Sequence, residues 1–204
     1  MIGILDIGMG NLRSVHNAVY QNGFDPVIVK FDKDFDDLTH LILPGVGNFS
    51  AAMPEIENRG LRLSVLDFVD SGRPLLGTCL GMQLLMKRSE EGGVHDGLGL
   101  IPGEVIRLTG RNLRVPHVGW NILNIKSIHP IFEGIKKGCD FYFVHSYHVI
   151  CEYQKDLLGS TEYGGSVSAV IGRDNVVGIQ FHPEKSQVNG LRMIENFCNW
   201  NGQC

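Results

Sequence analysis

Short apolar runs recur through the first half of the chain, each bounded by glycine, proline or charged residues. The runs cover residues 2–7, 27–29, 40–43 and 74–76. A short apolar run with such boundaries is typical of a buried strand, and segments with helical periodicity stand between the runs. Because strands alternate with helices, this half predicts an α/β fold with an open, mostly parallel sheet and helices on both faces.

The helical segments carry apolar residues three and four positions apart. This spacing predicts a helix over residues 12–21, which Asn22-Gly23 ends. A longer helical region reaches about residue 69 and is broken near Gly60. A further run with helical character covers residues 82–86, directly after the fourth apolar run.

The pattern changes after Glu90. Residues 92–103 are rich in glycine and predict a loop, and residues 104–124 contain short β-like pieces. Further on, the sequence predicts a strand over 141–150, a hairpin over 168–180 and a last helix over 189–199. The second half therefore predicts mixed or antiparallel strands. Since no linker divides the chain, we expect residues 1–204 to form a single domain.

Composition narrows the class of protein. The formal net charge is −4 at pH 7, and the chain lacks the clustered Lys and Arg that nucleic acid requires. No apolar run reaches the roughly 18 residues of a membrane span, and the N-terminus has no basic segment typical of a signal peptide. Five widely spaced cysteines without a C-x-x-C pair argue against a disulfide framework and favour the cytoplasm.

The segment Gly77-Thr78-Cys79-Leu80-Gly81 carries the strongest chemical signal. A residue with glycine two positions before and two positions after it, between a strand and a helix, matches the nucleophile elbow, here with cysteine in place of serine. The glycines permit a tight turn, and the N–H groups that begin the following helix favour a thiolate. We therefore expect covalent catalysis at Cys79.

A catalytic cysteine needs a base and a group that orients the base. His182 is the best candidate for the base, because it follows an apolar run at the strand end where open α/β sheets place their sites. Pro183 keeps the segment out of a helix, so Glu184 can project to the same side and accept a hydrogen bond from the ring. A structural histidine beside a surface glutamate is the alternative, which the elbow disfavours.

Pro44-Gly45-Val46-Gly47 follows another predicted strand. Its two glycines make backbone N–H groups available to an anion. With the N–H of Leu80, this loop is expected to form an oxyanion hole, although an ordinary turn also fits these residues. Glycines also permit a peptide flip, which would make the loop a switch.

Two weaker patterns point to no cofactor and no metal. Gly8-Met9-Gly10 follows a strand, but Arg13 stands where a dinucleotide-binding fingerprint requires glycine, so a plain turn is preferred. His117, His145 and His148 do not have ligand spacing on one helix, so we expect no metal site.

Taken together, these segments resemble the class I, triad-type glutamine amidotransferases, and among them the glutaminase subunits of imidazole glycerol phosphate synthase. The resemblance covers essentially the whole chain. The cysteine and His-Pro-Glu segments are common to many amidotransferases, whereas Pro-Gly-Val-Gly and Pro-His-Val-Gly-Trp-Asn are typical of this subunit. The motifs that carry it lie at residues 6–12, 44–47, 77–85, 116–121, 142–147 and 180–186.

The resemblance implies a flavodoxin-like fold and roles for individual residues. The implied catalytic triad is Cys79, His182 and Glu184. The implied oxyanion and glutamine-binding residues are Gly45, Val46, Gly47, Leu80, Gln83, His145, Ser146 and Tyr147. The implied partner interface includes Asn11, Trp120, Tyr142 and Lys185.

The resemblance also implies an activity and a partner. The chain would hydrolyse glutamine to glutamate and ammonia through a cysteine thioester. Its partner in a heterodimer would be a (β/α)₈-barrel cyclase subunit. That subunit would use the ammonia to make imidazole glycerol phosphate and an aminoimidazole carboxamide ribotide in histidine biosynthesis.

Three alternatives remain open from the sequence. A similar glutaminase subunit supplies ammonia to a different barrel partner for the amidination of a cell-surface sugar. A stand-alone cysteine hydrolase or peptidase would use the same residues without a partner. A non-catalytic binding subunit would keep only the fold, which the complete set of Cys79, His182 and Glu184 speaks against.

Overall fold

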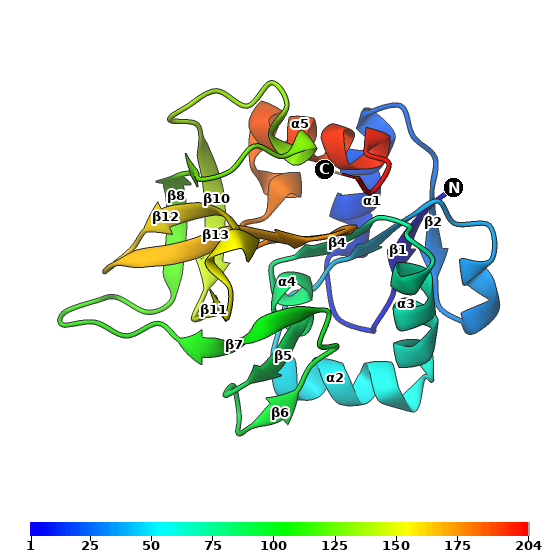
Figure 1. Cartoon of the computed structure of the whole chain (residues 1–204), viewed down its shortest axis with the longest axis horizontal. Helices are drawn as coiled ribbons and strands as arrows, with labels where there is room; N and C mark the ends of the chain where they lie inside the picture. Colours follow the sequence, from blue (N-terminus) through cyan, green and yellow to red (C-terminus); the bar gives the residue numbers. More distant parts are fainter. Residues whose placement is uncertain (204) are drawn as a thin grey trace.

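The computed structural model describes residues 1–203, and its centre is an eight-stranded sheet (Figure 1). Across the sheet the strands are β2 (Pro26–Val29), β1 (Ile2–Leu5), β3 (His40–Leu43), β4 (Leu75–Thr78), β14 (Val176–Ile179), β13 (Ser166–Arg173), β12 (Leu157–Glu162) and β9 (Asn124–Ile125). The first five are parallel, and β13, β12 and β9 continue the sheet with antiparallel pairing. This order confirms the predicted α/β class with antiparallel strands from the second half.

Helices cover both faces of the sheet. The helices α1 (Leu12–Gln21) and α5 (Gln187–Asn199) lie on one face, and α2 (Phe49–Asn58) and α3 (Leu61–Asp70) lie on the other (Figure 1). The predicted break near Gly60 is confirmed. Gly60 adopts a left-handed φ of 67°, which suits glycine and separates α2 from α3.

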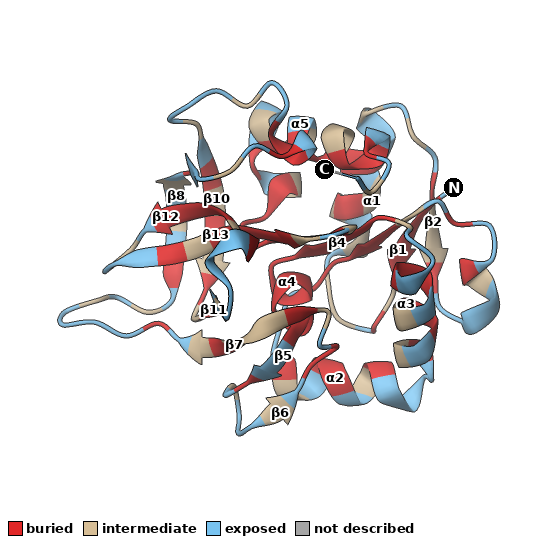
Figure 2. Ribbon diagram, viewed as in Figure 1, coloured by how far each residue is buried: buried red, intermediate tan, exposed pale blue. Residues whose placement is uncertain are grey.

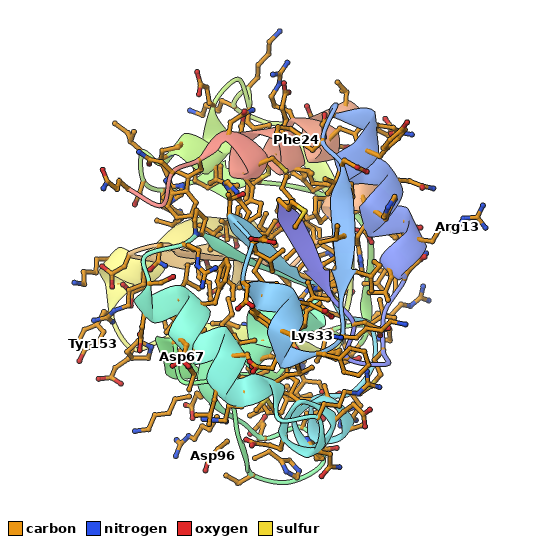
Figure 3. The ribbon with its side chains drawn as sticks, turned by 90° about the vertical axis from the view of Figure 1, so that its right-hand side faces the viewer. Arg13, Phe24, Lys33, Asp67, Asp96 and Tyr153 are labelled. Carbon is orange, nitrogen blue, oxygen red and sulfur yellow. The ribbon has the colours of Figure 1, made fainter. Side chains whose placement is uncertain are left out.

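Burial explains why the first four apolar runs were readable as strands. Strands β1 and β4 are buried at every residue, so their sequences are continuous apolar runs rather than alternating ones (Figure 2). The helices bury one side only. Arg13 on α1 and Asp67 on α3 project away from the sheet into solvent (Figure 3).

Two smaller sheets accompany the central one. The strands β8 (His117–Ile122) and β10 (Asp140–His145) pair as an antiparallel β8–β10 ribbon. The other sheet has the order β11 (Tyr147–Cys151), β7 (Ile101–Arg107), β5 (Met86–Ser89) and β6 (His95–Asp96). Short 3-10 turns occur at η1 (Asp32–Phe35), η2 (Pro130–Phe132), η3 (Gln154–Asp156) and η4 (Pro183–Lys185).

Three sequence predictions need correction. The helical run predicted over 82–86 is wrong at its end, because α4 (Leu80–Leu84) stops early and Met86 begins β5. The glycine-rich segment 92–103 is not all loop, since it contains β6 and the start of β7. The strand predicted over 141–150 is two strands, β10 and β11, which separate at Ser146 and join different sheets. In each case pairing with a distant strand, which periodicity does not reveal, decides the structure.

Candidate active site

Three parallel strands end side by side at one edge of the central sheet. Strand β4 lies between β3 and β14, with Gly77 opposite Leu43 on one side and Thr78 opposite Ile179 on the other. The chain leaves these strand ends into loop 44–47, the elbow and the Gln-Phe-His-Pro-Glu segment. Segments far apart in sequence therefore meet at the edge where open α/β sheets form their sites.

Cys79 stands on a strained turn between β4 and α4. Its φ of 54° and ψ of −107° lie outside the regions that a non-glycine residue normally adopts. The flanking glycines are required by close approach. A Cβ on Gly77 would lie 2.6 Å from the carbonyl oxygen of Gly81, and a Cβ on Gly81 would overlap the carbonyl oxygen of Leu43. The turn is tied to β14 by the N–H of Cys79, which donates to the carbonyl of Ile179 over 2.7 Å.

His182 and Glu184 are paired beside the elbow. Nδ1 of His182 donates to Oε1 of Glu184 over 2.9 Å, and the two side chains are only 4% and 3% exposed. Pro183 begins the single turn η4, which sets both side chains on the same side. The other ring nitrogen, Nε2, is not engaged by Glu184, and His182 and Cys79 line the same cavity.

The charge state of His182 follows from these contacts. Burial by itself would lower the pKa of the ring, but hydrogen bonding to Cys79 and Glu184, together with their negative charge, outweighs burial and raises the pKa to about 9. Because the pKa lies above 7, the ring is an imidazolium at neutral pH. An imidazolium that lines the same cavity as the sulfur is suited to donate a proton to a leaving group.

The loop 44–47 does not present an oxyanion hole in this structure. The N–H of Leu80, which the sequence predicts as an oxyanion donor, instead donates to the carbonyl of Gly45 over 3.4 Å. Gly45 fits against the elbow because a Cβ there would lie 2.9 Å from the Cβ of Leu80, and Gly47 has a φ of 131° that favours glycine. The loop therefore turns a carbonyl, rather than an N–H, toward the amide of Leu80.

A cavity of about 320 Å³ opens at Cys79. Of the residues that the sequence predicts for the site, Gly45 and Glu184 do not line it. Three residues to which the sequence assigned no role, Glu91, Pro116 and Val144, do line it. The predicted residues that line it are Val46, Gly47, Cys79, Leu80, Gln83, His145, Ser146, Tyr147, His182 and Lys185.

Gln180 is a polar residue of the site that the sequence analysis did not assign. It is fully buried, its Nε2 lies 4.0 Å from the sulfur of Cys79, and its Oε1 accepts a hydrogen bond from Nε2 of Gln83 over 3.2 Å. Nε2 of Gln83 also donates to the carbonyl of Tyr147 over 3.1 Å, which fixes the orientation of both amides. The signal that could have found Gln180 is an amide at the end of an apolar strand, two residues before the candidate base.

Replacement of Gln180 with glutamate is expected to slow alkylation of Cys79 by iodoacetamide at pH 7 at least tenfold. The new carboxylate still accepts the hydrogen bond from Gln83, but it presents negative charge where an N–H now faces the sulfur. A like charge at about 4 Å disfavours the thiolate by a few kcal/mol at an effective dielectric of ~20. The rate is measured by mass spectrometry of the labelled chain.

Gln154→Glu is the matched control, because the same change at this exposed residue of η3 adds the charge away from the pocket. The control should alkylate at the wild-type rate. Equal rates for Gln180→Glu and wild type would show that the amide does not influence the sulfur.

The residues implied for a partner interface lie on neighbouring elements. Trp120 and Tyr142 are cross-strand partners on the outer face of the β8–β10 ribbon, with ring centroids 5.8 Å apart. On the same face, Val118, Trp120 and Ile122 are 56%, 45% and 50% exposed. A contiguous exposed apolar face of this kind is typical of a docking surface.

The two remaining interface candidates flank this face. Lys185 is exposed on η4, which packs against both α1 and β10. Asn11 precedes α1, where its side chain accepts a hydrogen bond from the N–H of Ser14 over 3.2 Å. Asn11 therefore has a capping role that is independent of any partner.

The other described cysteines have no environment that favours chemistry. Burial raises the pKa of Cys151 and of Cys198 to about 12, so both thiols stay protonated. Cys139 is likewise free, and Cys204 lies outside the described residues.

Two other kinds of feature are absent within residues 1–203. No cluster of three potential metal-ligating side chains occurs there. Over the same residues, no helix has the length and apolar character needed to cross a membrane.

The fold and the site together define an amidotransferase class. The model of the class-I glutamine amidotransferase family matches residues 3–200, and the chain belongs to this family. Solved structures agree on the fold. PurLQS from Thermotoga maritima is 19% identical with a TM-score of 0.77 and 97% of each chain covered. A crystal structure described as a glutamine amidotransferase is 22% identical with a TM-score of 0.73, covering 97% of this chain and 98% of that one.

Relatives with higher sequence identity show which subfamily of the amidotransferases the chain belongs to. The chain is 47% identical over 204 residues to the imidazole glycerol phosphate synthase subunit HisH of Sulfurimonas denitrificans, with 98% of both chains covered. It is 46% identical over 201 residues to the HisH subunit of Desulfitobacterium hafniense, covering 98% of this chain and 94% of the relative. Within the class-I amidotransferases, the chain is thus a member of the HisH subunit family, as the sequence motifs predicted.

Proposed function

We propose that this chain is the glutaminase subunit of imidazole glycerol phosphate synthase and that Cys79, His182 and Glu184 are its catalytic triad. The observation that carries the proposal is the cavity that the elbow residue Cys79 shares with the buried imidazole of His182, whose Nδ1 is hydrogen-bonded to Glu184 over 2.9 Å. Membership of the HisH family supports glutamine as the substrate and imidazole glycerol phosphate synthase as the complex. The cavity beside the sulfur supports an amino-acid side chain as substrate.

In the first half of the reaction, the thiolate of Cys79 attacks the carboxamide carbon of the glutamine side chain. The carbonyl π electrons move onto oxygen and form a tetrahedral oxyanion. His182, as imidazolium, donates the proton on Nε2 to the departing nitrogen, and ammonia leaves as the thioester forms. General acid–base help of this kind is worth ~10²–10⁴ in rate.

In the second half, the now neutral ring of His182 removes a proton from water. The resulting hydroxide attacks the thioester, and the bond to sulfur breaks to release glutamate and regenerate the thiolate. Glu184 holds the ring in the orientation needed for both steps, because its Oε1 accepts the hydrogen bond from Nδ1.

Loop 44–47 is proposed as the switch of this reaction. A flip of the peptide after Gly45 would remove its carbonyl from the N–H of Leu80 and turn the N–H of Val46 toward the substrate oxygen. Two donors would then face the oxyanion, and one such donor is typically worth ~10²–10³ in rate. The proposal is supported by the hydrogen bond that occupies the N–H of Leu80 in the isolated chain.

The proposed partner is a (β/α)₈-barrel cyclase subunit that forms a heterodimer with this chain and consumes the ammonia. Ammonia in water at neutral pH is mostly ammonium, which is not a nucleophile, so a dry passage between the two sites keeps it reactive. The exposed apolar face of the β8–β10 ribbon supports docking at this position. The need for a reduced thiol at Cys79 supports the cytoplasm as the compartment.

The direct test is a coupled assay with the purified barrel subunit and its formimino-carboxamide nucleotide. With glutamine, the complex should release glutamate and form imidazole glycerol phosphate in equal amounts. The barrel subunit alone should form product only with ammonium salts. Glutamate release at the same rate with and without the barrel subunit would contradict the proposed switch.

Replacement of Trp120 with alanine is expected to weaken binding of the barrel subunit by about 2 kcal/mol, roughly a thirtyfold rise in Kd. A large aromatic side chain at the centre of an apolar docking face typically makes a contribution of this size. Glutamine hydrolysis by the fully assembled complex should change less. Titration calorimetry measures the first quantity, and a glutamate assay at saturating partner measures the second.

Phe31→Ala is the matched control for this change. Phe31 is an aromatic residue of similar or greater exposure, 61%, and it precedes η1, away from the ribbon. Its loss should leave Kd unchanged. A normal Kd for Trp120→Ala would remove this face from the interface.

A further inference from the structure

The β8–β10 ribbon has a second, buried face, and this face carries a pair of histidines. His117 and His145 are directly opposite each other in the ribbon, and Nδ1 of His117 lies 2.9 Å from Nε2 of His145. The ring of His117 is stacked between the rings of Tyr163 and Phe143, with centroid distances of 3.8 Å and 4.9 Å. The reaction proposed above gives His117 no role, although the residue is only 3% exposed.

The direction of every hydrogen bond through this pair follows from its two ends. Nδ1 of His145 lies 2.8 Å from the carbonyl oxygen of Tyr147, which only accepts, so this nitrogen carries the proton. Burial lowers the pKa of His145 to about 3 and of His117 to about 4, so both rings are neutral near pH 7. Nε2 of His145 is therefore an acceptor, and Nδ1 of His117 donates to it.

The other end of the pair agrees with this direction. Since His117 carries its proton on Nδ1, its Nε2 is an acceptor. Asn121, four residues further along β8 and on the same face, has its amide nitrogen 3.3 Å from that atom, and an amide nitrogen only donates. The same nitrogen donates to the carbonyl of Glu162 over 3.0 Å, which fixes the amide in this orientation. The chain thus runs in one direction, from Asn121 through both rings to Tyr147.

The carbonyl of Tyr147 is the point where this chain reaches the pocket. It accepts from His145 and also from Gln83, and both of these residues line the cavity at Cys79 together with Ser146. If the donor on His117 were lost, the ring of His145 could carry its proton on Nε2 instead, and the bond to Tyr147 would then break. The tautomer of His145, and with it the position of the segment at Ser146, depends on His117.

We propose that His117 is a positioning residue for glutamine, which fixes the tautomer of His145 and thereby holds the carbonyl of Tyr147 and the adjoining Ser146 segment against the substrate. This inference rests on the proposed glutaminase function and deepens it. The effect is on substrate binding, because His117 does not itself line the cavity at Cys79 and acts on it through His145, which does.

The test compares three variants in the complex with the barrel subunit. His117→Phe keeps an aromatic ring between Tyr163 and Phe143 but removes both hydrogen bonds. It should raise KM for glutamine about five- to tenfold, the effect of one lost hydrogen bond, with kcat within about twofold of wild type. His117→Gln supplies an amide that can donate to His145 and accept from Asn121, so it should return KM to within about threefold of wild type.

The matched control is His129→Phe. His129 is another buried histidine whose pKa burial lowers to about 4, and its Nδ1 accepts from the N–H of Ile131. Its ring packs on Trp200 and Phe132, neither of which lines the glutamine pocket. This variant should lower thermal stability without changing KM.

Nitrogen NMR of the histidine rings gives a readout that activity does not. Nε2 of His145 should appear as an unprotonated hydrogen-bond acceptor in wild type, and a protonated Nε2 should appear in His117→Phe as the ring changes tautomer. A wild-type KM for His117→Phe, equal rises in KM for His117→Phe and His129→Phe, or a His117→Gln variant as impaired as His117→Phe would each overturn the inference. Absence of glutamine turnover by the wild-type complex would instead refute the proposed function itself.

Discussion

Replacement of Cys79 with alanine is expected to abolish glutamine-dependent synthesis by the complex and to leave ammonia-dependent synthesis within about twofold of wild type. The sulfur makes the only covalent bond to the substrate, and loss of a nucleophile from a triad lowers kcat by a factor on the order of 10⁶. External ammonia bypasses this subunit because it enters the reaction after the glutaminase step. Product formation with glutamine and with ammonium salts, each in the presence of the barrel subunit, measures both effects.

Cys139→Ala serves as the control, because Cys139 is also a free thiol and does not line the cavity at Cys79. It should support both reactions at the wild-type rate. If Cys79→Ala also lost the ammonia-dependent reaction while the complex remained assembled, the sulfur would have a structural role instead of the proposed chemical one.

Replacement of Gly81 with alanine is expected to destabilise the chain by at least about 3 kcal/mol and to remove glutaminase activity. The new Cβ would overlap the backbone carbonyl of Leu43, so β3 and the elbow would have to move apart. Overpacking against side chains costs about 1–3 kcal/mol, and backbone cannot rotate away as a side chain can. Urea denaturation of the isolated chain measures the stability, and the coupled assay measures the activity.

Gly110→Ala is the corresponding control. The nearest atom to a Cβ at Gly110 is the Cβ of Leu113, 3.2 Å away, and Gly110 is an exposed residue outside any helix or strand with no positive φ. This change should shift stability by less than about 1 kcal/mol. Wild-type stability and activity for Gly81→Ala would mean that the elbow does not need glycine at this position.

The parts of the fold that could be predicted from sequence are those whose burial is evident from the local pattern of apolar residues. The third strand, His40–Leu43, and the first helix, Leu12–Gln21, have the predicted bounds, because an uninterrupted apolar run and a helical stripe each report one environment. The failures at Met86 and Ser146 have the opposite character. Met86 begins a strand that pairs with Ile101, and Ser146 separates β10, which pairs with β8, from β11, which pairs with β7. The expectation of a single domain stays a prediction.

The candidate site divides in the same way. The elbow and the His-Pro-Glu segment were found because each motif is local and each follows a predicted strand. The amide of Gln180 beside the sulfur and the carbonyl of Gly45 on Leu80 are contacts between separate segments, and no spacing in the sequence reports them. The histidine pair was visible only as residues without ligand spacing. The catalytic and binding roles of the individual residues remain proposals that the experiments above test.

The hydrogen bond between Leu80 and Gly45 sets a limit on how far glutamine hydrolysis is suppressed in the chain without its partner. A single bond of 3.4 Å contributes about 1 kcal/mol net, which favours the blocked conformation over the open one by only about fivefold. If nothing else held the loop, an idle subunit would still leak glutamine at a measurable fraction of its full rate. If so, an excess of this subunit over its partner would hydrolyse glutamine without any use of the ammonia released.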